Sequence, residues 1–384
     1  MPATSAMLLP MSERGSRSYE LDLLRLLAAG SVVAFHFTYG NHALGFNPVT
    51  YPAALTAVTK YGFLGVQVFF FISGIVILNS ARSGSGRRFA ISRMVRLYPA
   101  YWACVTATFL VLNMAGSRHV PVADYVVNMS MLEGFLVHPL IDAVYWTLQV
   151  ELIFYGIIWL TLVTGQMKRI TAVLWAWLGV AGLTTLVQVS GATVPNRIIV
   201  ATGYAAYFAV GAAAALLVRG DRRQSVVLLL AASCGLSLAR AFYDARAARA
   251  MYHGVNVGVA VAVVAASMAL VLAVAFGRLA RLGRPWMVGA GLLTYPLYLL
   301  HDEVSNVLFT RWHALNRWVL LTVVLLIVSA ASFAVHAFVE RPVAGRLRLA
   351  LDEVWSRLSG LRGTRGTAAV APPPAPVVSP IPPV

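Results

Sequence analysis

Long apolar runs alternate along the chain with short segments that carry most of its arginines. A helix of about 20 apolar residues is long enough to cross the hydrocarbon core of a bilayer. The pattern therefore predicts an all-α, polytopic bundle of about ten transmembrane helices. The predicted spans are residues 21–40, 60–80, 99–115, 146–165, 170–188, 198–218, 225–239, 254–276, 286–301 and 318–338.

Two parts of this pattern leave the number of spans open by one. The runs 225–239 and 286–301 are short for a membrane helix. The segment 120–145 is only half apolar, which favours a re-entrant or interfacial segment rather than a full span.

The composition is typical of a membrane domain. Of the 384 residues, 59% are hydrophobic and 11% are charged, whereas soluble domains contain about 25% charged residues. The net charge is +16, but the basic residues lie mainly between apolar runs, where they orient helices and contact anionic lipid headgroups. No separate face of basic and aromatic residues is present, so we expect no nucleic-acid partner.

The basic loops predict the orientation of the chain in the membrane. Arginine and lysine concentrate before the first span and after the second, fourth, sixth, eighth and tenth spans. Because basic loops stay on the cytoplasmic side, both termini are expected there. One loop disagrees, since Arg240, Arg246 and Arg249 would lie outside. Either the span count is wrong around residues 225–254 or these arginines have another role.

The expected organisation is one membrane domain with two polar ends. Residues 1–18 form a cytoplasmic N-terminal segment, and residues 19–345 form the transmembrane domain. Residues 346–384 form a cytoplasmic tail that is rich in Pro and Ala and is predicted to be disordered from about residue 362. The sequence does not determine the oligomeric state.

The first span carries two ionisable residues, Arg25 and His36, which are eleven residues apart. On an α-helix this separation is a rise of about 16 Å with a net rotation of about 20°. Both side chains therefore share one face, with Arg25 near the cytoplasmic end and His36 past the middle of the bilayer. Ionisable residues at that depth are functional candidates, although snorkelling to the interface also explains Arg25 taken alone.

Acyl transfer from coenzyme A is the chemistry that fits this pair. An arginine near the cytoplasmic mouth can bind a phosphate through a bidentate contact. The long pantetheine arm would carry the thioester to a neutral histidine, which can accept a proton from an attacking hydroxyl. Arg93 and Arg96 share a helix face and would flank the same nucleotide. Anchoring by the positive-inside rule explains these two arginines equally well.

The fourth span carries a carboxylate, Glu151, about one turn inside its outer end. A buried carboxylate needs a partner, and His36 or an arginine is the expected one. Glu151 would then orient the imidazole as a carboxylate does in a catalytic triad; the alternative is a structural ion pair. The glycines of the segment 65–74 favour close helix packing. Further candidates for lining the site are Ser73, Trp146, Tyr298 and His301.

Other common site chemistries have no motif in the sequence. There is no P-loop, no HExxH motif, no nucleophile elbow followed by Asp and His, and no Cys/His cluster with metal-ligand spacing. The two cysteines lie in apolar runs and form no disulfide framework. We therefore expect no metal cofactor.

Together these motifs resemble the acyltransferase-3 family of integral membrane O-acyltransferases over most of the chain, from about residue 20 to residue 342. Arg25 and His36 match the Arg-x10-His motif of that family. The other matching segments are 65–74, 93–99, 146–151, 298–301 and 340–342. Their common order and their positions relative to the spans make the resemblance specific.

The resemblance implies transfer of an acyl group, usually acetyl, from cytoplasmic acyl-CoA to a hydroxyl of a carbohydrate or lipid-linked glycan at a bacterial inner membrane. It makes His36 the catalytic histidine and Arg25, Arg93 and Arg96 residues that bind or shape the donor site. Two alternatives stay open: O-acylation of a small secondary metabolite such as a macrolide, and transport of a glycan precursor. Intramembrane His, Glu and Arg also mark transport pathways, but the internal repeats of many transporters are not visible here.

Overall fold

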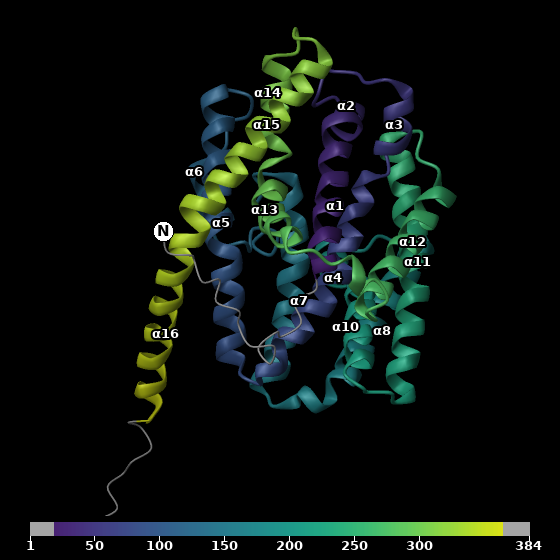
Figure 1. The fold of residues 1–384 in the computed structure, drawn as a ribbon, viewed down its shortest axis with the longest axis vertical. Coiled ribbons are helices and arrows are strands. Elements are labelled where there is room, and N and C mark those ends of the chain that lie inside the picture. The colour runs from purple at the N-terminus through teal and green to yellow at the C-terminus, as the bar shows by residue number, and fades with distance from the viewer. Residues whose placement is uncertain (1–18, 364–384) are drawn as a thin grey trace, which may run out of the picture.

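The computed structural model describes residues 19–363 as a bundle of helices, and no strand occurs within that range (Figure 1). Nine helical segments among these residues are long and apolar enough to cross a membrane. A further apolar helix, α13 (Trp286–Leu300), has 15 residues. The prediction of an all-α polytopic bundle with about ten spans is confirmed. The other helices are α1 (Tyr19–Phe35), α2 (Asn41–Ala43), α3 (Ala53–Thr59), α4 (Gly65–Ser80), α5 (Gly86–Ala115), α6 (Val122–Asn128), α7 (Trp146–Val163), α8 (Ile170–Val189), α9 (Asn196–Thr202), α10 (Ala205–Val218), α11 (Gln224–Tyr252), α12 (Val257–Ala275), α14 (Glu303–Arg311), α15 (Arg317–Val335) and α16 (Arg341–Gly363).

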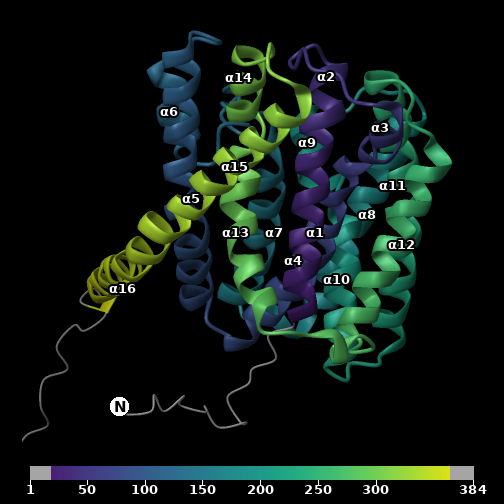
Figure 2. The ribbon, with the colours of Figure 1, turned by 45° about the horizontal axis from the view of Figure 1, so that its top comes forward.

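The short helices α2, α3, α6 and α14 gather at one end of the bundle, which is at the top of Figures 1 and 2. The chain of α1 reaches this end through a π-helical turn, His36–Gly40, so we call it the His36 end. Such turns are frequent at functional sites. A Cβ on Gly40 would overlap the ring of Phe35, so glycine is needed for this turn. The segment 120–145 contributes the short helix α6 there, and the spanning segment that follows α5 begins at Ala143.

Helices α4 and α10 cross closely near the middle of the bundle. A Cβ on Gly74 would overlap the carbonyl oxygen of Phe208, and a Cβ on Gly211 would overlap the carbonyl oxygen of Phe71. Two glycines therefore let the two backbones touch, as small residues do in membrane helix pairs. The packing role that the sequence favoured for the segment 65–74 agrees with the position of Gly74.

The helix α11 is longer than the apolar run that predicted it. It has 29 residues and continues to Tyr252, so the expected end of the seventh span at residue 239 is wrong. Arg240 lies inside the helix and is 3% exposed. Its Nη2 is 2.8 Å from Asp244 Oδ1, and its Nη1 donates to Gln188 Oε1 at 2.5 Å. Buried partners hold this arginine, so the positive-inside rule does not apply to it.

The C-terminal part of the described chain is a helix that the sequence did not predict. After α15, a second π-helical turn, His336–Glu340, leads into α16 without a break. Arg87 on α5 pairs with Asp352 on α16 at 2.7 Å. The N-terminal segment 1–18 and the tail from residue 364 onward lie outside the described residues.

Candidate active site

Two cavities meet inside the bundle. The larger has a volume of about 1090 Å³, and His36 and Asp302 are among its lining residues. The smaller has a volume of about 360 Å³ and is lined by Arg25 and other basic side chains. Val66 and Tyr298 line both cavities, so the two spaces adjoin at these side chains. We call them the histidine cavity and the arginine cavity.

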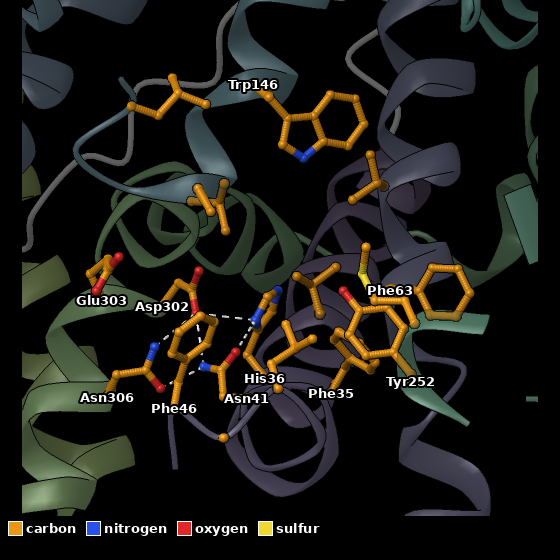
Figure 3. A pocket seen from close by; sticks show the side chains of 18 of the residues that line it. Phe35, His36, Asn41, Phe46, Phe63, Trp146, Tyr252, Asp302, Glu303 and Asn306 are labelled. Carbon is orange, nitrogen blue, oxygen red and sulfur yellow. Dashed lines mark hydrogen bonds and ion pairs between the residues drawn. The ribbon is translucent and has the colours of Figure 1, made fainter. Parts of the chain in front are cut away.

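His36 contacts two polar side chains through one ring nitrogen (Figure 3). Its Nδ1 is 3.1 Å from Asp302 Oδ1 and 3.0 Å from Asn41 Oδ1. Asn41 Nδ2 donates to Asp302 Oδ1 at 2.8 Å and to Asn306 Oδ1 at 2.7 Å. Because oxygen acceptors surround Nδ1, this nitrogen carries the proton in the neutral ring, and Nε2 is the basic nitrogen.

Asp302 supplies the charge that supports His36. Its carboxylate is buried, and its Oδ1 accepts a hydrogen bond from Asn41 Nδ2 at 2.8 Å and faces His36 Nδ1 at 3.1 Å. An ionised carboxylate at Nδ1 stabilises the imidazolium that forms when Nε2 accepts a proton. The arrangement is therefore suited to general base catalysis on a hydroxyl in the histidine cavity.

His301 packs against the ring of His36 and lines neither cavity. The centroids of the two imidazole rings are 5.0 Å apart, and the rings are inclined by 74°. His301 Nδ1 donates to the carbonyl oxygen of Tyr298 at 2.7 Å. Its ring is fully buried. The structure thus gives His301 a supporting position, whereas the sequence suggested a lining one.

The arginine cavity collects the three arginines that the sequence singled out. Arg25 comes from α1, whereas Arg93 and Arg96 come from α5. Arg25 Nη1 lies 3.2 Å from Asp22 Oδ1, and Arg96 pairs with Glu340 at the end of the second π-helical turn. Three guanidinium groups around one small space can bind phosphate oxygens through paired hydrogen bonds.

Glu151 lies at the arginine cavity and not beside His36. Its Oε1 accepts hydrogen bonds from Ser73 Oγ at 3.0 Å and from Tyr155 OH at 2.7 Å. The carboxylate at His36 is Asp302 instead. The expected pairing of Glu151 with His36 is therefore wrong.

The direction of α7 explains this placement. Trp146, the first residue of α7, lines the histidine cavity. Glu151 lies five residues further along, a rise of about 7.5 Å, and lines the arginine cavity. Between them, Thr147 Oγ1 donates to Tyr298 OH at 3.1 Å. Ser73, Trp146 and Tyr298, which the sequence suggested as lining residues, all border one of the two cavities.

Comparison with protein families adds the decisive observation. A family model described as an acyltransferase domain matches residues 18–338. The chain belongs to the acyltransferase-3 family. It is a membrane acyltransferase, and all residues that line its two cavities lie within the matched region. No curated protein and no solved structure matches the chain.

Three polar residues around His36 in this acyltransferase were not anticipated from the sequence: Asn41, Asp302 and Asn306. A signal for Asp302 was available, because it directly follows His301 at the end of an apolar run whose end is on the same side of the membrane as His36. The two asparagines carried no such signal, since asparagine is common at helix ends for capping alone.

The arginine cavity is lined by three cationic side chains. Within residues 19–363, no group of three or more His, Cys, Asp or Glu side chains is arranged to hold a metal ion. Arg25, Arg93 and Arg96 are arginines, whose guanidinium groups can bind an anionic group.

Proposed function

We propose that this acyltransferase moves an acyl group, usually acetyl, from acyl-CoA to a hydroxyl of a carbohydrate or lipid-linked glycan. One observation carries the proposal: the His36–Asp302 pair faces a cavity that adjoins the arginine cavity at Tyr298 and Val66. A base with its orienting carboxylate and a site for an anionic donor thus lie next to each other.

The arginine cavity suits the phosphate groups of coenzyme A, because guanidinium groups bind phosphate in a bidentate manner. Arg25 and His36 follow one another along α1 and its π-helical turn with a rise of about 16 Å, which a pantetheine arm can cover. The thioester would pass Tyr298 and reach His36. Since acyl-CoA is cytoplasmic, we place the arginine cavity and both termini on the cytoplasmic side of a bacterial inner membrane.

We propose direct transfer, with His36 as the general base. The proton of the acceptor hydroxyl moves to His36 Nε2 while the hydroxyl oxygen attacks the thioester carbonyl carbon. Asp302 stabilises the imidazolium. When the tetrahedral intermediate collapses, the carbon–sulfur bond breaks, and the sulfur takes the proton from His36. The products are the ester and the free thiol of coenzyme A, and the neutral histidine is restored.

Release of free thiol tests the proposal. The purified protein in lipid nanodiscs is given acetyl-CoA and a set of methyl glycosides, and free thiol and acetylated glycoside are measured. We expect acceptor-dependent release that His36→Ala abolishes. The control His119→Ala, which replaces an exposed histidine, should retain it. No thiol release, together with movement of a labelled glycolipid in proteoliposomes, would establish the transporter alternative.

A further inference from the structure

One face of α11 forms a wall of the histidine cavity. The spacing of its lining residues, by three and four positions, places them on one side of the helix. The small side chains of Ala247 and Ala248 leave space along this side, and Asp244 brings a carboxylate to it. The proton transfer at His36 does not explain this wall. The lining residues of α11 are Asp244, Ala247, Ala248, Met251 and Tyr252.

One carboxylate oxygen of Asp244 is paired with Arg240, and the other can accept a hydrogen bond. Its Oδ1 is 2.8 Å from Arg240 Nη2. Its Oδ2 is buried and has no hydrogen-bond partner among residues 19–363. The same holds for Oε1 of Gln67, a side chain from α4 that lines the same cavity. Buried acceptors without partners are costly, and a ligand with hydroxyl groups would satisfy both.

The carboxylates around the histidine cavity are all compensated by basic groups at ion-pair distance. A charged ligand beside Asp244 would therefore find no free counter-charge, and a neutral polar ligand fits better there. Arg311 also lines the cavity, but this side chain is exposed. The compensated pairs are Asp302 with His36, Glu303 with Arg118, and Asp244 with Arg240.

Two aromatic residues lie next to the polar groups of this wall. The ring centroids of Trp146 and Tyr204 are 4.8 Å apart, and the Arg240 guanidinium lies 5.4 Å from the centroid of the Tyr204 ring. The indole nitrogen of Trp146 is directed into the cavity (Figure 3). An aromatic edge with an N–H donor beside hydrogen-bond acceptors matches a sugar ring, which has apolar C–H groups and hydroxyls at its edge.

We propose that Asp244, Gln67, Trp146 and Tyr204 form a subsite that binds the acceptor as a neutral sugar ring. The ring hydroxyls donate to Asp244 Oδ2 and Gln67 Oε1, and a sugar oxygen accepts a hydrogen bond from the indole N–H of Trp146. Arg240 neutralises and orients Asp244 as a positioning residue. This inference rests on the proposed function and adds the acceptor class: a neutral glycosyl unit, in preference to amino sugars and uronic acids.

Matched acceptors test the charge preference. Methyl glycosides of neutral hexoses are compared with their amino-sugar and uronic-acid counterparts at saturating acetyl-CoA. We expect kcat/KM for the neutral rings to be at least about tenfold higher, a difference of about 1.4 kcal/mol. Equal use of the charged rings, or release of thiol with a macrolide but with none of the sugars, would overturn the inference.

Two variants test the residues themselves. Gln67→Leu removes one acceptor without changing any charge. The double variant R240Q/D244N removes both charges of the pair, so no lone charge stays buried. We expect each to raise the KM for the sugar about tenfold while the KM for acetyl-CoA is unchanged. The matched control D221N/R223Q removes an exposed ion pair of 2.6 Å and should change neither constant.

A third variant, Ala247→Phe, narrows the wall and leaves all charges in place. It should also raise the KM for the sugar. If the double variant does not fold, this variant and Gln67→Leu together test whether the wall binds the sugar. An unchanged sugar KM in both, or parallel rises in the KM for sugar and for acetyl-CoA, would mean that the wall only supports the fold. Absence of thiol release by the unaltered protein would refute the proposed function instead.

Discussion

His36 Nδ1 lies 3.1 Å from Asp302 Oδ1, although one residue follows α1 and the other follows α13. The two helices pack against each other, and the C-terminal ends of both point toward the His36 end of the bundle. The orientation of the imidazole thus depends on a contact between the first and the last third of the chain.

Replacing Asp302 by asparagine should lower kcat about 10²-fold. Asparagine does not stabilise the imidazolium and can present an amide N–H to Nδ1, which selects the wrong tautomer. Initial rates of thiol release measure the effect. Glu151→Gln is the comparison, and we expect a smaller loss of kcat because Glu151 lies at the arginine cavity. An equal loss in both variants would restore a catalytic role for Glu151.

Removal of an arginine from the arginine cavity should act on donor binding. For Arg25→Ala and Arg93→Ala we expect the KM for acetyl-CoA to rise about tenfold or more, because each loses a charge-assisted hydrogen bond to phosphate. The control is Arg87→Ala, which breaks the pair with Asp352 outside both cavities. An unchanged KM would show that Arg25 only snorkels and that Arg93 only anchors the helix.

Tyr298 should limit the length of the acyl chain that the enzyme accepts, because it lies where the two cavities adjoin. In Tyr298→Ala we expect the ratio of kcat/KM for octanoyl-CoA to that for acetyl-CoA to increase, since the space beside His36 becomes larger. Phe46→Ala is the control, because Phe46 lines only the histidine cavity and is 60% exposed. Equal ratios in the two variants would contradict this role of Tyr298.

The glycine contact between α4 and α10 should determine stability rather than activity. Gly211→Ala places a Cβ against the carbonyl oxygen of Phe71, and we expect a loss of about 1–3 kcal/mol in the free energy of unfolding. Thermal unfolding in detergent, followed by tryptophan fluorescence, measures it. Gly179→Ala on α8 is the control, since a Cβ there meets no atom within 4 Å. An equal melting temperature for both variants would contradict the close crossing.

The membrane architecture was predictable because the bilayer acts on each segment separately. A helix that crosses the hydrocarbon core needs about 20 apolar residues and internal backbone hydrogen bonds, whatever helices surround it. The same reasoning failed at the end of α11. There, Arg240 and Asp244 compensate each other across one helical turn, so the helix continues where the apolar pattern stops.

The candidate site was predictable only within single helices. The spacing of Arg93 and Arg96 indicates a shared face, because an α-helix has about 3.6 residues per turn. The partner of His36 was assigned wrongly, because the rotation of α7 and the depth of Glu151 depend on packing against other helices. Asp302 directly follows His301, which the sequence singled out, and this position was the available signal for it.

By itself, the sequence determined an all-α membrane bundle and the depth at which Arg25 and His36 lie along the first span. The tertiary structure alone decided that Asp302 and Asn41 orient His36, that Glu151 lies with the arginines, and that Asp244 faces the histidine cavity. The physical reason is that apolar length and helical period are local properties. Contacts between helices arise from their mutual rotation and depth, which are set by the packing of the whole bundle.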